Sequence, residues 1–150
     1  MNSARILLAA TSAILGCAVL APSASLADDS KALTVTKQCN TAAQATVADE
    51  LSYCTILASN VSQLVGAKVR YYGPGFFTAT HKFLDSWVVI EANQGTAFGH
   101  CLLRGVPAVL GACEFTGGSG SLTGFKADVT VTSADFITWQ WKGASSHDEE

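Results

Sequence analysis

The sequence predicts a mainly β protein, built as an antiparallel barrel or sandwich. After Gly66, short runs of alternating or β-branched residues recur at intervals of about ten residues, separated by clusters of turn residues. Four cysteines follow an apolar leader, a pattern typical of small exported folds. Hydrophobic residues make up 49% and charged residues only 14% of the 150 residues, so the chain can bury a core.

The first 27 residues have the layout of a secretory signal peptide. Arg5 precedes an uncharged apolar stretch from Ile6 to Ala21, and Ser25 and Ala27 are small residues suited to a cleavage site. We predict cleavage after Ala27 and a periplasmic or extracellular location. The mature chain then holds a single barrel-like domain over 28–144 and a flexible acidic tail over 145–150.

Cys17 supports a second interpretation of the leader. The segment Ile14-Leu15-Gly16-Cys17 resembles a bacterial lipobox, in which the cysteine becomes the lipidated first residue, although Leu15 stands where a small residue is usual. The mature mass separates an anchor at Cys17 from cleavage after Ala27.

Composition and motifs exclude several classes of function. The chain has 9 Lys and Arg against 12 Asp and Glu, with no basic cluster, so we expect no nucleic-acid partner. Beyond the leader, no apolar run reaches the roughly 20 residues of a transmembrane helix. Nucleophile-elbow, Walker, zinc-protease and dinucleotide motifs are missing, and we predict neither a cofactor nor a metal.

The cysteines of the mature chain are Cys39, Cys54, Cys101 and Cys113. An even number in an exported chain favours two disulfides over zinc, because no C-x-x-C pair exists and the three histidines are not spaced as partners. Cys101 and Cys113 flank a stretch with Gly105 and Pro107 that suits a hairpin connection, and facing cysteines on such a hairpin can bond. The remaining pair is then Cys39 with Cys54.

Leu33 to Cys39 alternates and is the first predicted strand, with Leu33, Val35 and Lys37 on one side. Thr116 to Gly120 is predicted as a break in the chain because it holds three glycines. The other predicted strands are 67–72, 76–83, 86–91, 96–103, 109–115, 125–132 and 136–141.

Ala42 to Val65 is ambiguous. Apolar residues recur every three or four positions, which predicts an amphipathic helix around Val47–Val65. A helix that starts at Ala42 would carry Cys54 about 18 Å along its axis, which conflicts with a Cys39–Cys54 bond. A later start near Asp49, a different cysteine pairing and a partly extended segment all remain open.

Three landmarks in order give the segment Phe98–Gly143 a resemblance to a known superfamily. They are Phe98-Gly99-His100 with Gly105, the glycine turn Thr116–Gly120 with Gly124, and the closing run Trp139–Gly143. Together they resemble the allene oxide cyclase barrel, a lipocalin-like superfamily that includes the dirigent proteins. The resemblance implies a small closed antiparallel barrel. It carries over no active site, because nothing in 28–72 lines up with the substrate-binding positions of the plant cyclases.

Few residues suggest chemistry. His81 could form an acid–base pair with Asp85 or Glu91, and His100 and Glu114 could line a lumen, although surface or structural roles are commoner for all three. A cluster of aromatic residues could form a hydrophobic ligand mouth or simply pack in the core: Tyr71, Tyr72, Phe76 and Phe77. Trp139 and Trp141 point the same way along a strand, and we expect them to pack inside.

These observations favour a non-catalytic exported barrel that binds a small hydrophobic ligand or a partner surface. The alternative is a cyclase, isomerase or dirigent-like enzyme acting on a hydrophobic substrate in the lumen, which requires polar groups converging in an apolar cavity. A third option is an α+β cone in which the helix packs in a curved sheet. Association into homo-oligomers is left open.

Overall fold

The structure is a computed structural model of the chain. Within the described residues, no helix is long and apolar enough to cross a membrane. The predicted signal peptide, its cleavage site at Ala27, the lipobox at Cys17 and the candidate His81 lie outside the described residues. The described ranges are 30–40, 53–73, 75–77, 82–105 and 109–147.

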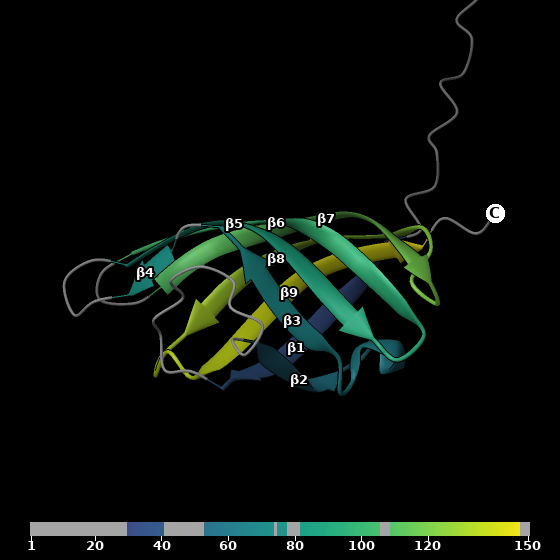
Figure 1. Cartoon of the computed structure of the whole chain (residues 1–150), viewed down its shortest axis with the longest axis horizontal. Coiled ribbons are helices and arrows are strands. Elements are labelled where there is room, and N and C mark those ends of the chain that lie inside the picture. Colours follow the sequence, from purple (N-terminus) through teal and green to yellow (C-terminus); the bar gives the residue numbers. More distant parts are fainter. Residues whose placement is uncertain (1–29, 41–52, 74, 78–81, 106–108, 148–150) are drawn as a thin grey trace, which may run out of the picture.

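Consecutive antiparallel strands wrap into a closed barrel of eight strands (Figure 1). The sheet runs in the order β3-β2-β1-β9-β8-β7-β6-β5, and pairing of β3 with β5 closes it, while the short β4 adds to the edge of β5. This confirms the predicted mainly β fold. The strand bounds are β1 Lys31–Cys39, β2 Cys54–Ser59, β3 Lys68–Tyr72, β4 Gly75–Phe77, β5 Lys82–Ala92, β6 Gly95–Arg104, β7 Val109–Gly120, β8 Phe125–Ser133 and β9 Thr138–His147.

Large side chains fill the interior of the barrel. Every second residue of β8 is buried from Phe125 to Ser133, which is the strict alternation that places one face inside a closed sheet. Trp139 and Trp141 both lie inside, as predicted, and Phe115 packs against Trp141 with 5.4 Å between ring centroids. The largest fully buried apolar side chains are Trp141, Phe115, Phe125, Leu33, Ile56, Leu64, Ile90 and Leu122.

Both predicted disulfides are present, and each joins directly opposite residues on neighbouring strands. Cys101 on β6 is bonded to Cys113 on β7, with 4.0 Å between Cα atoms. Cys39 at the end of β1 is bonded to Cys54 at the start of β2, with 3.8 Å between Cα atoms. The second bond therefore links β1 to β2 at the end of the first strand pair.

The helix predicted around Val47–Val65 is wrong for its described part. Residues 54–59 form β2, and only a 3₁₀ turn, Ser62–Leu64, follows. The side chains of Cys54 and Ile56 point inward and β2 pairs with both β1 and β3, so main-chain pairing outweighs the helical spacing of the apolar residues. The remainder of that segment, up to residue 52, lies outside the described residues.

The predicted break at Thr116–Gly120 is also wrong, because β7 continues to Gly120 and the turn follows at Ser121–Gly124. A Cβ on Gly118 would overlap the backbone oxygen of Leu122, so this glycine allows β7 to lie against the turn that follows it. The flexible tail predicted over 145–150 is wrong for its described part, because residues 145–147 are strand. β9 continues to His147, because Ser145 pairs with Lys31 and Ala127 and is buried.

Candidate functional site

Lys37 is a lysine in the barrel lumen. It lies on β1 on the same face as Leu33 and Val35, and its side chain is only 2% exposed. β1 runs between β2 and β9, so Lys37 stands opposite Ile56 on one side and Trp139 on the other. Among the described residues it is the only charged side chain in the fully buried set.

The ammonium nitrogen of Lys37 is enclosed by aromatic rings and sulfur. Its Nζ lies 5.1 Å from the ring centre of Tyr71 and 5.2 Å from the ring centres of both Trp139 and Trp141. The same atom lies 3.4 Å from Sγ of Cys54 and 3.9 Å from Sγ of Cys39. Ring faces favour a cation electrostatically, and a disulfide sulfur is a weak acceptor, so these groups can hold the amine. No carboxylate of the described residues forms an ion pair with it.

Burial controls the charge of this site. Removal from water disfavours the ammonium form and lowers the pKa of Lys37 from 10.5 to about 7. Burial also raises the pKa of Tyr71 well above its usual value of 10, so its phenol stays neutral. Within the described residues, both ion pairs lie elsewhere, between Arg70 and Glu91 and between His100 and Asp85. Lys37 is therefore an amine that changes charge near neutral pH.

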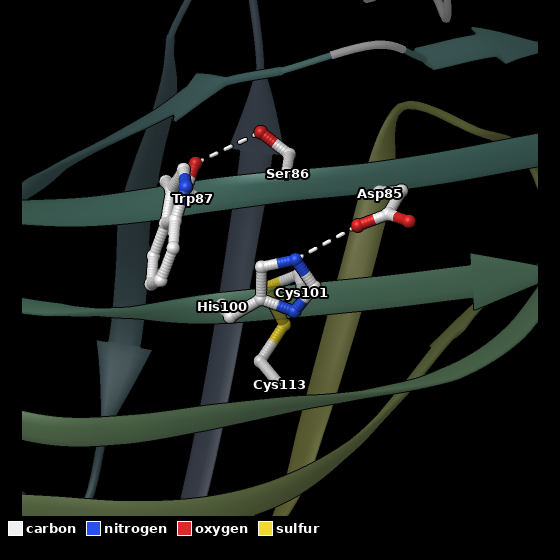
Figure 2. Close-up of polar contacts among 6 residues, drawn as sticks. All are labelled: Asp85, Ser86, Trp87, His100, Cys101 and Cys113. Carbon is white, nitrogen blue, oxygen red and sulfur yellow. Dashed lines mark hydrogen bonds and ion pairs between the residues drawn. A yellow bond between two sulfur atoms is a disulfide. The ribbon is translucent and has the colours of Figure 1, made fainter.

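A second polar cluster lies on the outer face of β5 and β6 (Figure 2). His100 Nε2 lies 2.8 Å from Oδ1 of Asp85, and the two side chains are 41% and 46% exposed. The ring of Trp87 stands edge-on to the His100 ring with 5.3 Å between centroids, and Trp87 is 67% exposed. The neighbouring Cys101 points to the opposite side of the sheet, where it bonds Cys113. The pair is thus a surface feature and not part of the lumen.

A shallow groove of about 400 Å³ crosses the outer face of β6 to β9 next to this pair. The middle of the groove is hollowed at Ala112, because the alanine side chain is smaller than those of its cross-strand neighbours, Leu102 on β6 and Thr130 on β8. Leu102 and Ala112 make one side apolar. Charged and polar groups line the rest of the groove: His100, Glu114, Asp128, Thr130 and Lys142.

The structure places the residues predicted to line a lumen on the outer face of the barrel. His100 and Glu114 are directly opposite each other on β6 and β7, but both lie on the outer face, which corrects their lumenal assignment. Their side follows from the alternation of the strands, since their neighbours Cys101 and Cys113 occupy the inside. Asp85, considered as a partner for His81, forms a hydrogen bond with His100, and His81 itself lies outside the described residues.

Of the second pairing considered for His81 and of the predicted aromatic mouth, only part lies within the described residues. Glu91, the second acid considered for His81, pairs with Arg70, whose Nε lies 2.9 Å from Oε2 of Glu91. Tyr71 contacts the core, whereas its neighbour Tyr72 is 46% exposed on the outside. The side chains of Phe76 and Phe77 lie outside the described residues.

Lys37 was not among the candidate residues, although the sequence carried a signal for it. The alternation of β1 placed Lys37 on the side of Leu33 and Val35, and a lysine on an apolar strand face is rarely buried without a functional reason. The sequence does not show which side chains surround Lys37. The three aromatic rings come from β3 and β9, far along the chain, and they meet Lys37 only in the closed barrel.

Comparison of the chain with protein-family models, with curated proteins and with solved structures found no match.

Proposed function

We propose that this protein is an exported, non-catalytic binding barrel that holds a small molecule in the groove on its outer face. The observation that carries the proposal is the groove itself, which combines a volume of about 400 Å³ with an apolar side and several charged and polar lining residues. Two disulfides suit an oxidising compartment outside the cytoplasm. The proposal moves the ligand from the lumen, where large side chains occupy the described positions, to the barrel wall.

The charges around the groove favour a ligand with a cationic group. Glu114 and Asp128 are directly opposite each other on β7 and β8, and like charges in that position destabilise a sheet. A positive group on the ligand would relieve this repulsion. Lys142 lines the groove from β9, so the cation is expected nearer the two carboxylates, with the apolar body over Leu102 and Ala112.

A pair of matched probes tests this proposal. Tryptamine and indole-3-propionate share an indole and differ in the sign of their charge, and binding is followed by ¹⁵N chemical shifts of the oxidised protein. Tryptamine is expected to shift Leu102, Ala112 and Thr130, with a dissociation constant on the order of 1 mM or tighter for a ligand of this size. Indole-3-propionate is expected to bind more weakly.

Two variants locate the binding. Ala112→Arg fills the centre of the groove and is expected to abolish the tryptamine shifts. Thr132→Arg adds the same side chain on the outer face of β8, away from the groove lining, and should leave them unchanged. Equal affinity for both probes would remove the role of the carboxylates. Tryptamine binding that survives Ala112→Arg would overturn the groove proposal.

Lys37 favours a second candidate function, an enzyme of the cyclase or isomerase type acting in the lumen. An amine with a pKa of about 7 is suited to general acid–base or nucleophilic work near neutral pH. Trp141 Nε1 lies buried nearby and has no acceptor among the described residues. Membership in the allene oxide cyclase-like superfamily would be consistent with this alternative and remains a proposal.

Reductive alkylation tests whether a small molecule can reach Lys37 in the lumen, as such an enzyme requires. Benzaldehyde condenses with a neutral amine, loses water and is fixed by cyanoborohydride. At pH 7, a lumen open to apolar carbonyl compounds predicts faster labelling of Lys37 than of the exposed Lys142, because more of Lys37 is neutral. Labelling of Lys142 alone would count against lumenal chemistry at this amine.

A further inference from the structure

We propose that the Cys39–Cys54 disulfide is a thiol-exchange site, at which a small thiol bonds to Cys39 while Cys54 leaves as a thiolate beside the ammonium of Lys37. The inference concerns the end of β1 and the start of β2, where this disulfide joins the two strands, and it is independent of the outer groove. It assigns a modification site with a defined class of reactant, a low-molecular-weight thiol, and a defined role for the buried lysine.

The two sulfurs of this disulfide have different surroundings. Cys39 is half-buried at the end of β1, whereas Cys54 is 3% exposed and faces the lumen. Lys37 Nζ lies closer to Cys54, at 3.4 Å, than to Cys39, at 3.9 Å. Cys39 is therefore the less buried and more open of the two cysteines to attack, and the sulfur nearer the amine is the one that would receive the negative charge.

The exchange balances with a thiol as the only co-reactant. The thiolate sulfur forms a bond to Sγ of Cys39, the Cys39–Cys54 bond breaks, and its electron pair stays on Sγ of Cys54. A cation next to a sulfur lowers its thiol pKa, and a leaving thiol of lower pKa leaves faster. The Cys54 thiolate in turn favours the ammonium form of Lys37, because two opposite charges at this separation in an apolar lumen attract strongly. A second thiol, or return of Cys54, releases the adduct.

The second disulfide of the same chain is a matched internal control. Cys101 and Cys113 are also opposite residues on adjacent antiparallel strands, with a similar Cα separation of 4.0 Å against 3.8 Å. They are 0% and 1% exposed. Within the described residues, no lysine forms a hydrogen bond to either of their sulfurs, in contrast to Cys39 and Cys54. A difference in reactivity between the two bonds thus reports exposure and the lysine rather than the type of disulfide.

The test is partial reduction of the intact protein with glutathione at pH 7, quenched by acid and followed by mass spectrometry. Cleavage after Glu50 separates Cys39 from Cys54, so the position of the glutathione adduct is resolved. The expected results are reaction of Cys39–Cys54 at least about tenfold faster than of Cys101–Cys113, and an adduct on Cys39. Equal rates for the two disulfides, or an adduct mainly on Cys54, would overturn the proposal.

Lys37→Met separates the lysine from simple exposure. Methionine keeps an unbranched apolar side chain one atom shorter than that of lysine and removes the charge, and the ratio of the two reduction rates is expected to fall about tenfold. Lys31→Met removes an exposed lysine of the same strand, β1, and should leave the ratio unchanged. The rate for Cys101–Cys113 in Lys37→Met reports whether the barrel has opened, since it rises only if the fold is lost. A folded variant with an unchanged ratio would show that Lys37 plays no part.

Discussion

Replacement of Lys37 by methionine is expected to change how the stability of the barrel depends on pH. The pKa of Lys37 is lowered in the folded protein to about 7, whereas it is 10.5 as an ordinary lysine. Between these two values the unfolded chain binds more protons than the folded one, so the free energy of unfolding rises with pH. Below pH 7 the folded state carries the full cost of the buried lysine, and the cost disappears as pH approaches 10.5.

The size of the effect follows from the shift. A change of about 3.5 pKa units corresponds to roughly 5 kcal/mol at 1.36 kcal/mol per unit, and between pH 6.5 and 9 about 2–3 kcal/mol of it is recovered. These are upper values, because the rings of Tyr71, Trp139 and Trp141 favour the ammonium form. Tyr71 is the other titratable side chain among these neighbours, and its raised pKa keeps it neutral in this window.

Urea unfolding followed by tryptophan fluorescence measures the effect, since Trp139 and Trp141 are buried beside Lys37. Lys37→Met is expected to be more stable than the wild type at pH 6.5, and its advantage should shrink by about 2–3 kcal/mol by pH 9. Lys142→Met, at an exposed position, should follow the wild-type curve. Parallel curves for wild type and Lys37→Met would refute the lowered pKa and the burial that causes it.

Two further changes test the turn before β9 and the packing of β9 on β8. Asp135→Asn is expected to lower the melting temperature at pH 7, because the backbone N–H groups of Thr138 and Ile137 donate to Oδ1 of Asp135 and lower its pKa. The stability gained from this lowered pKa is lost as pH falls below about 3.8, so thermal scans at pH 7 and pH 3 should show the difference from wild type shrinking; a constant difference would contradict it. Gly143→Ala is expected to cost about 1–3 kcal/mol in urea unfolding, because a Cβ there would overlap the backbone oxygen of Asp128. An unchanged midpoint would mean that β8 and β9 pack less closely than described.

Alternation allowed the sequence to predict the barrel strands after Gly66. In β8 the inward and outward residues follow a strict period of two, which needs no knowledge of the rest of the chain. β2 could not be predicted in this way, because Leu57 and Ala58 are consecutive exposed residues beside a register shift between Thr36 and Lys37. An irregular strand with apolar residues every three or four positions resembles a helix when its pairing partners are unknown.

The sequence predicted the two disulfides more completely than it predicted the positions of the candidate functional residues. The pairing of the neighbouring strands β6 and β7 brings Cys101 and Cys113 together by local geometry. The side of His100 and Glu114 depends on which face of β6 and β7 is enclosed, and only closure of the sheet decides that. The enclosure of Lys37 likewise depends on contacts between distant strands.

A direct titration of Lys37 is the simplest test of the claim that this lysine is buried in the lumen with a lowered pKa. In protein labelled with ¹³C at the lysine Cε, the account predicts a resonance that is shifted by the surrounding rings, titrates near pH 7 and is missing from Lys37→Met. A spectrum in which every lysine titrates near 10.5 would contradict the buried position of Lys37, and with it the proposed role of Lys37 in thiol exchange.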